Sequence, residues 1–377
     1  MTSLPVITDL LVMKFGGTSM GGAERMRVAA GIVVEQHHKR PVAVVVSAMA
    51  KVTDLLLETM RRAELGDTGV VDANVQTLLN RHLEACIDLG ITASAVDRVK
   101  NLLSEFRRIC NGIAMLGERP PRSVDEAVAI GERLSSVILA AFLESIGTPA
   151  REVNAADVIV TDAVFGNASP QMEPTRIKSD TVLRPLLAER IVPIITGFNG
   201  ATADARPTTL GRGGSDFSAS IVAAALDAAE LWIWTDVDGI MTADPRLVKN
   251  VAVLPEVTYA EAAELAYNGA KVLHPRTLAP LVERRIPVWS KNSFAPEKPG
   301  TKIVSHFDEP NGVRAVTSMS NVALISMEPA NSALSGTRLM ARTLDALALA
   351  NVEILLFSSS SYRQSFCFLI RKPELEL

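Results

Sequence analysis

Continuous apolar runs alternate with longer amphipathic segments over most of the chain. The runs are predicted to be strands, and they cover 10–15, 41–48, 191–197, 231–236 and 286–290. Helices are predicted near 24–37, through most of 53–145, and over 215–229. Strands that are apolar throughout, such as PVAVVVSA at 41–48, are typical of a parallel sheet that is buried on both faces. The alternation therefore predicts an α/β domain with helices on both sides of a mainly parallel sheet.

Several polar residues are placed where helices are expected to begin. Ser123 and Glu126 have the spacing of a capping box and are expected to open the last helix before residue 145. Thr258 and Glu261 have the same spacing and predict a further helix after residue 258. Ser215 is a suitable N-cap for the helix at 215–229.

The last part of the chain has a different pattern. The segment APEKPGTKI at 295–303 is rich in proline, glycine and charge, and it is predicted to be a linker. After it the pattern indicates strand, helix, strand and strand, at 321–328, 336–352, 353–359 and 365–370. We therefore expect two domains, at 1–303 and 304–377.

Composition narrows the class of protein. The 377 residues are 48% apolar and 21% charged with a net charge of −4, as in an ordinary soluble globular protein. No basic tract occurs, so we expect no nucleic-acid partner. The apolar stretches are too short to span a bilayer and the first residues do not resemble a secretion signal, so we expect a cytoplasmic protein without a membrane partner. Three cysteines without CxxC spacing indicate reduced thiols, and the histidines form no metal-ligand pattern.

The stretch KFGGTS places Lys14 at a strand end, followed at once by Gly16 and Gly17. In an open α/β sheet, ligands bind beyond the carboxyl ends of the strands. Glycines there expose backbone N–H groups to an anion, and Lys14 adds a positive charge, so the arrangement suits a polyphosphate. Neither GxxxxGK[ST] nor GxGxxG occurs at this position. The alternative is a tight turn with a solvated lysine.

The stretch TTLGRGGSDFSAS at 208–220 surrounds Arg212 with glycines and leads into a helix. Asp216 in the first turn is favoured by the helix dipole, which is a sufficient structural reason for it. However, Gly213 and Gly214 exceed what a cap needs. They indicate close backbone approach to a charged ligand, and Arg212 can form a two-pronged bond with a carboxylate.

Three further stretches have a structural and a functional interpretation. TDVDGIMTADPR at 235–246 is either a turn with Asx hydrogen bonds or the edge of a nucleotide site. In YNGAKVLHP at 267–275, Lys271 can complement a helix dipole, and His274 before a proline is expected to be a structural turn residue. In AIGERLSS at 129–136, Glu132 lies on an apolar helix and is interpreted, on this segment alone, as half of a surface salt bridge.

Together these stretches resemble aspartokinases of the amino acid kinase family. KFGGTS, VVSAMAKVTD, IGERLS, TTLGRGGSD, TDVDGIMTADPR and GAKVLHP occur in the family's order between residues 14 and 275. The part from about residue 320 resembles the start of an ACT-type amino-acid-sensing domain. The resemblance implies a three-layer αβα sandwich with a truncated α+β ACT-like domain. It also implies phosphorylation of the side-chain carboxylate of L-aspartate by ATP and Mg²⁺ to give 4-phospho-L-aspartate, the first step of lysine, threonine and methionine biosynthesis.

The resemblance also implies residue roles. Lys14 would hold the transferring phosphate, and Asp216 would orient Lys14. Aspartate would be bound by Ser47, Thr53, Glu132, Phe198 and Arg212. ATP would be bound by Lys14, Gly16, Gly17, Gly213, Gly214, Thr235, Asp236, Met241, Arg246 and Lys271, with Mg²⁺ held mainly by the phosphates rather than by protein ligands. The family often has tyrosine at the position of Met241, and methionine keeps the apolar contact but lacks the ring and the hydroxyl. A homodimer or higher homo-oligomer is expected.

The chemistry of the residues agrees with this assignment. Phosphoryl transfer needs positioning and charge neutralisation, and a carboxylate with a pKa of about 3.9 needs no general base. Accordingly, the stretches offer lysines and arginines but no obvious base. The alternatives are a kinase for glutamate, acetylglutamate or carbamate, and a non-catalytic amino-acid sensor on a kinase fold. A dehydrogenase is not expected because the dinucleotide fingerprint is absent, although some aspartokinases carry a homoserine dehydrogenase as a second half.

The ACT-like part ends after its third strand, so we expect the sequence to be a fragment with an open sheet edge that is exposed or paired with another subunit. LLFSSSSYRQSFCF at 355–368 is closer to the threonine-responsive branch than to the lysine-responsive one. Leu355 stands where the lysine-responsive type places an aspartate. We expect this chain's incomplete sensor to bind nothing, and the intact protein to respond to threonine more than to lysine.

Overall fold

The computed structural model describes residues 7–270, 273–307, 312–328, 336–350, 352–360 and 365–376. They form two compact units. The first contains the described residues up to 267 and from 273 to 316, and the second contains 268–270 and those from 317 onward. Residue 303, the predicted end of the first domain, lies within a strand of the first unit. None of the described helices is long and apolar enough to cross a membrane.

An eight-stranded sheet forms the centre of the first unit, in the order β3-β5-β2-β1-β8-β10-β11-β9. Its strands are β1 (Leu11–Phe15), β2 (Val42–Val46), β3 (Ala150–Val153), β5 (Val192–Thr196), β8 (Glu230–Thr235), β9 (Glu256–Thr258), β10 (Val288–Asn292) and β11 (Thr301–Val304). All pairs are parallel except β10 with β11. The five predicted strands and the mainly parallel sheet are therefore confirmed.

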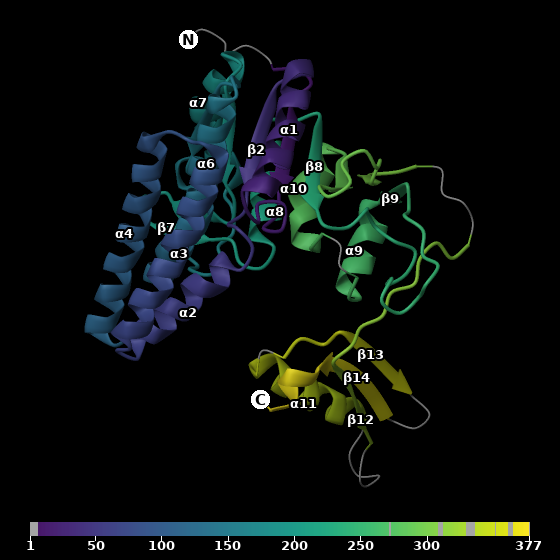
Figure 1. Ribbon diagram of the computed structural model, residues 1–377. Helices are drawn as coiled ribbons and strands as arrows, with labels where there is room; N and C mark the ends of the chain where they lie inside the picture. The colour runs from purple at the N-terminus through teal and green to yellow at the C-terminus, as the bar shows by residue number, and fades with distance from the viewer. Residues whose placement is uncertain are drawn as a thin grey trace. The chain divides into compact units, whose positions relative to one another are not determined.

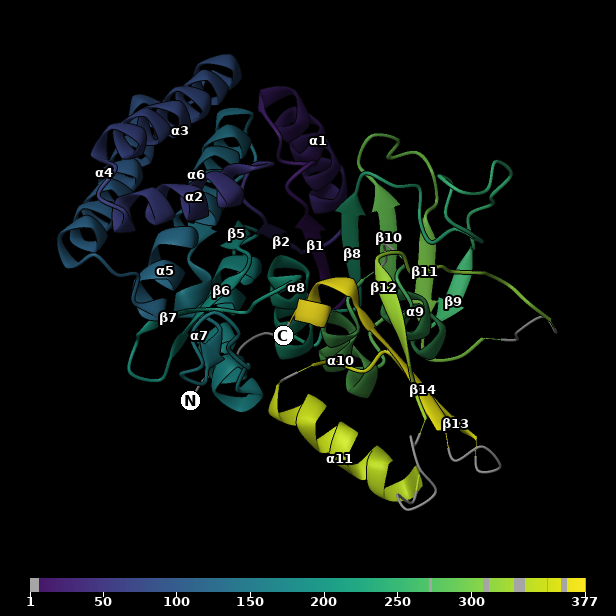
Figure 2. The same ribbon diagram turned by 90° about the horizontal axis from the view of Figure 1, so that it is seen from below.

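Helices cover both faces of this sheet (Figure 2). One face carries α1 (Ala23–Lys39), α2 (Val52–Glu64), α3 (Thr68–Leu89), α4 (Ala93–Leu116), α5 (Pro121–Val128) and α6 (Ile130–Ser145). The other carries α7 (Met172–Ala188), α8 (Gly214–Ala225), α9 (Tyr259–Tyr267) and α10 (Pro275–Arg284). The layers follow from the period-2 geometry of strands. Leu11 and Met13 of β1 join the core under α1–α6, whereas Val12 joins the core on the other face. The three-layer αβα sandwich is thus confirmed.

A small sheet in the order β4-β6-β7 lies beside this sandwich and leads into the glycine-rich loop of the candidate site. Its strands are β4 (Val160–Thr161), β6 (Asn199–Thr202) and β7 (Pro207–Thr209), and the 3-10 helix η1 (Ala155–Asp157) precedes β4.

Two of the expected helix starts are wrong. Ser123 and Glu126 lie inside α5, whose N-cap is Pro120 and whose first residue is Pro121. Proline suits the first helical position because its missing N–H would have no partner there. Similarly, α8 begins at Gly214 rather than after Ser215. The capping box of α9 is confirmed, because Thr258 N donates to Glu261 Oε2 at 2.7 Å and Glu261 N donates to Thr258 Oγ1 at 3.1 Å.

The predicted linker at 295–303 is also wrong in its last part. Thr301 and Ile303 are buried in β11, which pairs with β10 and β9. The alternation of buried Thr301 and Ile303 with Lys302 is a strand pattern that the preceding Pro-Gly pair obscures.

The second unit has the predicted order of strand, helix, strand and strand (Figure 1). It comprises β12 (Val322–Met327), α11 (Gly336–Leu349), β13 (Leu356–Ser360), β14 (Ser365–Arg371) and the 3-10 helix η2 (Lys372–Glu376). The sheet is antiparallel, in the order β12-β14-β13. Alternate residues of β14, namely Phe366, Phe368 and Ile370, form its buried core. The residues of β13, at one edge of this sheet, are all exposed.

Candidate active site

The strand that carries Lys14 ends next to the first turn of α8. Lys14 is 8% exposed, and its Nζ lies 2.5 Å from Asp216 Oδ1. Lys14 lies in β1 opposite Ile233 of β8, so the ion pair forms at the carboxyl end of the parallel strands. This is the edge of an open α/β sheet at which ligands bind. The two residues that were expected to act together are therefore in direct contact.

The two glycines after Lys14 lie close to neighbouring atoms, so both positions are restricted by packing. A Cβ at Gly16 would lie 3.2 Å from Lys14 Nζ, and a Cβ at Gly17 would lie 3.1 Å from Ala48 O. The Gly16 N–H donates to Trp234 O at 3.2 Å, so it is already used within the protein. Consequently, Gly16 shapes the site by leaving room for the Lys14 amine, and it does not offer a free N–H to an anion.

Ten of the predicted site residues come together around one cleft of 590 Å³. They are Lys14, Gly17, Ser47, Thr53, Glu132, Phe198, Arg212, Gly213, Gly214 and Asp216. These residues come from β1, the β1–α1 connection, the β2–α2 connection, α2, α6, the β5–β6 turn, the β7–α8 loop and the start of α8. The convergence of these separate parts of the chain on one cleft supports the choice of these residues as a group.

Glu132 is buried at the cleft, so its interpretation as half of a surface salt bridge is wrong. It is 3% exposed, and its Oε1 accepts from Ala48 N at 3.1 Å. Its Oε2 is buried and has no hydrogen-bond partner among the described residues. Burial raises the pKa of Glu132 to about 8, and the hydrogen bond from Ala48 N and, less strongly, the charge of Lys14 partly offset this increase. Such a carboxylate lacks a cation, which a ligand can supply.

Gly131 explains why this carboxylate reaches the cleft. A Cβ at Gly131 would lie 2.8 Å from the Cβ of Ala48. A larger residue would therefore keep α6 away from the β2–α2 connection. The hydrogen bond between Glu132 and Ala48 N depends on that close approach.

The loop between β7 and α8 presents Arg212 to the cleft. Gly211 and Gly213 have φ of +75° and +70°, which other residues rarely adopt. A Cβ at Gly214 would lie 2.6 Å from Phe198 Cδ2, so this glycine permits the aromatic ring to line the cleft. Arg212 itself is exposed, and it forms no ion pair with the described part of the chain.

The other predicted nucleotide residues do not line this cleft. Thr235 ends β8, which neighbours β1, and its Oγ1 donates to Asp236 Oδ1 at 3.2 Å. Met241 forms a bridge with Val253, and the Arg246 guanidinium lies 2.6 Å from Asp244 Oδ2. Lys271 lies outside the described residues. His274 is a structural turn residue as expected, because its Nδ1 accepts from Arg276 N at 3.2 Å.

Two charged residues of the cleft were not singled out from the sequence. Lys51 precedes α2 with φ of +65°, an unusual conformation for a residue with a side chain, and Asp54 lies in the first turn of α2. Both lie within the VVSAMAKVTD stretch. Their types give no indication of function alone, because lysine and aspartate next to a helix start are common on protein surfaces.

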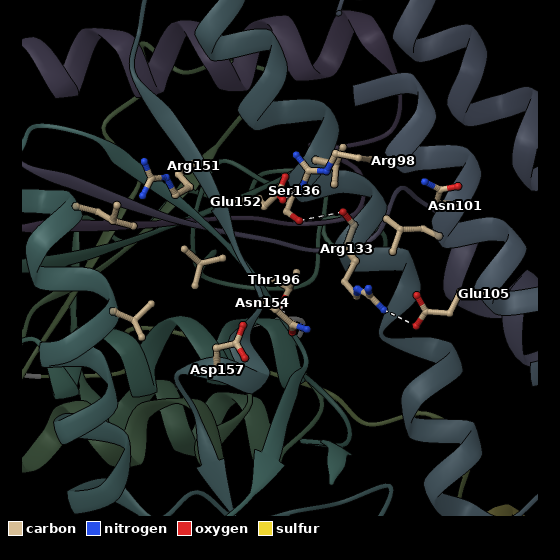
Figure 3. A pocket seen from close by; sticks show the side chains of 15 residues that line it. Arg98, Asn101, Glu105, Arg133, Ser136, Arg151, Glu152, Asn154, Asp157 and Thr196 are labelled. Carbon is tan, nitrogen blue, oxygen red and sulfur yellow. Dashed lines mark hydrogen bonds and ion pairs between the residues drawn. The ribbon is translucent and has the colours of Figure 1, made fainter. Parts of the chain in front are cut away.

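A second cavity of 520 Å³ lies at the β3 end of the sheet (Figure 3). It is lined by Arg98, Asn101, Glu105, Arg133, Ser136, Arg151, Glu152, Asn154, Asp157 and Thr196, together with five apolar residues. Arg133 Nη1 donates to Glu105 Oε1 at 2.8 Å, and Arg98 pairs with Glu152. Most of its charged groups therefore neutralise one another. We call this the outer cavity.

The comparisons with known proteins agree with the fold. The model of the amino acid kinase family matches residues 9–292. The chain belongs to the amino acid kinase family.

Within that family its relatives are aspartokinases. It is 34% identical to the chloroplastic bifunctional aspartokinase/homoserine dehydrogenase 1 of Arabidopsis thaliana, over 99% of this chain and 42% of that protein. It is 37% identical to Arabidopsis aspartokinase 3, over 84% of this chain and 57% of that protein. The chain thus spans about half the length of these curated relatives. The structure of E. coli aspartokinase III in complex with aspartate and ADP has a TM-score of 0.81 and 32% identity, covering 96% of this chain and 78% of that one.

Proposed function

We propose that this chain carries the activity of an aspartate kinase. It transfers the γ-phosphoryl group of ATP to the β-carboxylate of L-aspartate and yields 4-phospho-L-aspartate and ADP. A carboxylate oxygen forms the new bond to phosphorus, and the bond between that phosphorus and the β–γ bridging oxygen breaks. The relatives named above support the proposal, since one of them is an aspartokinase solved with aspartate and ADP.

The observation that carries the proposal is the buried Oε2 of Glu132, which has no partner among the described residues, in a cleft that also contains Arg212 and Lys14. An amino acid has an ammonium group that suits Glu132 and an α-carboxylate that suits Arg212. Its side-chain carboxylate is ionised at neutral pH and attacks phosphorus without a general base. The cleft therefore offers complementary charges for each part of the substrate.

In this proposal Lys14 stabilises negative charge on the transferred phosphoryl group, and Asp216 holds the Lys14 amine in place through its 2.5 Å contact. Ser47, Thr53 and Phe198 complete the aspartate site. Thr235, Asp236, Met241, Arg246 and Lys271 are proposed to contact the nucleotide. Mg²⁺ is proposed to enter with ATP, held mainly by its phosphates.

The second unit is proposed to be part of an ACT-type sensor, with threonine favoured over lysine as the effector of the intact protein. A homo-oligomer and a cytoplasmic location are proposed as well. These proposals rest on the family resemblance.

Trapping of the acyl phosphate tests the activity. The protein is incubated with MgATP, hydroxylamine and either aspartate, glutamate or homoserine, and the hydroxamate is measured. We expect aspartyl hydroxamate in the aspartate reaction alone. Glutamyl hydroxamate at a comparable rate would assign a different substrate. No turnover with any of the three would favour the non-catalytic sensor.

A further inference from the structure

Arg276, in the first turn of α10, makes contacts that the proposed function leaves unexplained. Its Nη1 donates to Leu210 O at 3.2 Å and to Asn167 Oδ1 at 2.5 Å. Its Nη2 donates to Ala168 O at 2.7 Å. Leu210 comes two residues before Arg212. The guanidinium therefore fixes the backbone at the start of the loop that presents Arg212.

The same guanidinium also contacts the far end of this loop. Its Cζ lies 4.8 Å from the ring centroid of Phe217, which directly follows Asp216 in α8. Arginine stacks on aromatic rings in this way while its N–H groups donate elsewhere. Leu210 and Phe217 thus flank residues 211–216 in the sequence, and Arg276 contacts both Leu210 and Phe217.

The loop depends on such contacts because it has little side-chain packing of its own. Gly211 and Gly213, which flank Arg212, have many accessible conformations in the absence of external contacts. A Cβ at Gly211 would lie 2.5 Å from Asn167 Oδ1, the atom that accepts from Arg276. A Cβ at Gly213 would lie 3.5 Å from His274 Cβ in the residue before α10. The first turn of α10 therefore acts as a support for the loop.

We propose that Arg276 is a positioning residue that fixes the β7–α8 loop so that Arg212 presents its guanidinium to the substrate α-carboxylate. This inference rests on the proposed function, since it assigns Arg212 to the substrate. The inference adds a contact between two sequence stretches that have different proposed ligands, TTLGRGGSD for aspartate and GAKVLHP for the nucleotide. Arg276, which directly follows GAKVLHP, makes this contact.

The test compares Arg276→Ala and Arg276→Lys with the wild type by steady-state kinetics. Arg276→Ala is expected to raise the KM for aspartate by about tenfold or more, as misplacement of a binding group does, while the KM for ATP changes by less than about twofold. Arg276→Lys is expected to lie between these values, because an ammonium keeps the charge but lacks the planar fork of donors and the flat face that stacks on a ring. Arg284→Ala, which removes the exposed Arg284–Asp227 pair from the same helix, is the control and should change neither KM.

A double mutant separates positioning from general stability. In an Arg212→Ala background, adding Arg276→Ala should change the aspartate KM by less than about twofold, because the group that Arg276 positions is already absent. Full additivity of the two effects, or equal increases in both KM values, would overturn the inference. If Arg276→Ala does not fold, Asn167→Ala at the exposed acceptor is used in the same cycle, with the same outcomes. An aspartate KM that rises in Arg212→Ala but not in the Arg276 variants refutes only this inference, whereas an unchanged KM in Arg212→Ala refutes the proposed clamp itself.

Discussion

The cleft and the outer cavity have similar volumes, 590 and 520 Å³, but their charged groups are organised differently. In the outer cavity Arg98 pairs with Glu152 and Arg133 pairs with Glu105. In the cleft Lys14 and Asp216 form a pair, but Glu132 has an oxygen without a partner among the described residues. Cavity size and the presence of charge are thus poor guides to function. A buried charged group that lacks a protein partner is the better guide.

Two consecutive residues of α6 show the difference clearly. Glu132 lines the cleft, and Arg133 lines the outer cavity. Arg133 donates a hydrogen bond to Glu105, whereas Glu132 is buried and its pKa is raised to about 8. A buried, incompletely paired carboxylate destabilises the folded protein, so its presence calls for an explanation. We infer that Glu132 is kept in this position because it binds the substrate.

The largest effect is expected for Lys14. Lys14→Ala should lower kcat by about 10²-fold or more, the scale of losing one preorganised donor to transition-state charge. Thermal melting should remain cooperative. Arg133→Gln, in the outer cavity, is the control and should leave kcat within about twofold, because Arg133 does not line the cleft. A Lys14→Ala enzyme with nearly normal kcat would remove this lysine from the mechanism.

Arg212 should have the next largest effect. Arg212→Lys replaces a two-pronged donor by a point charge, so the KM for aspartate should rise by about tenfold, with a much smaller change for ATP. The matched control is Arg151→Lys, which changes an exposed arginine of the outer cavity and should have no effect. Equal changes for both substrates would assign Arg212 to structure.

The pH dependence of aspartate binding should show whether Glu132 binds the ammonium group of the substrate. An ammonium group binds the ionised carboxylate, and burial raises the pKa of Glu132 to about 8. Aspartate affinity should therefore increase with pH by up to about tenfold per unit between pH 6 and 8, and then level off. Glu132→Gln should abolish this slope. A slope that persists in the variant would have to arise from another group.

The smallest effect concerns stability. Gly131→Ala adds a Cβ 2.8 Å from Ala48, so it should destabilise the fold by about 1–3 kcal/mol in urea unfolding. Gly112→Ala, in α4 with no atom within 4 Å of the added Cβ, should instead stabilise by up to about 1 kcal/mol. If both variants behaved alike, the close approach of α6 to the β2–α2 connection would not explain the glycine.

Five strands of the main sheet were predictable because their burial is encoded locally, whereas β3, β9 and β11 are shorter and were not predicted. A run such as Val42–Val46 is apolar at every position, and only a strand buried on both faces or a core helix needs that. The order of strands and helices then restricts the fold to a few topologies. The grouping of the site residues came from the family resemblance, whereas the rule that ligands bind beyond the carboxyl ends of parallel strands pointed to Lys14 alone.

The sequence-based predictions were wrong where contacts between distant parts of the chain determine the structure. The spacing of Ser123 and Glu126 suits a capping box, but Pro120 and Pro121 start the helix earlier. Glu132 has no local feature that distinguishes a solvated pair from a buried carboxylate, since its position depends on Gly131 meeting Ala48 from another part of the chain. Arg276 was also missed, because its acceptors lie 66 to 109 residues away in sequence.

The most direct test of the proposed role of Glu132 is calorimetric titration of aspartate into the wild type and into Glu132→Gln and Arg133→Gln. These substitutions change adjacent residues of one helix that line different cavities. We expect Glu132→Gln to weaken aspartate binding by about tenfold or more, the loss expected for a charged hydrogen bond, and Arg133→Gln to leave it within about twofold. Normal binding by Glu132→Gln, or a comparable loss in Arg133→Gln, would contradict the claim that the unpaired carboxylate of the cleft binds the substrate.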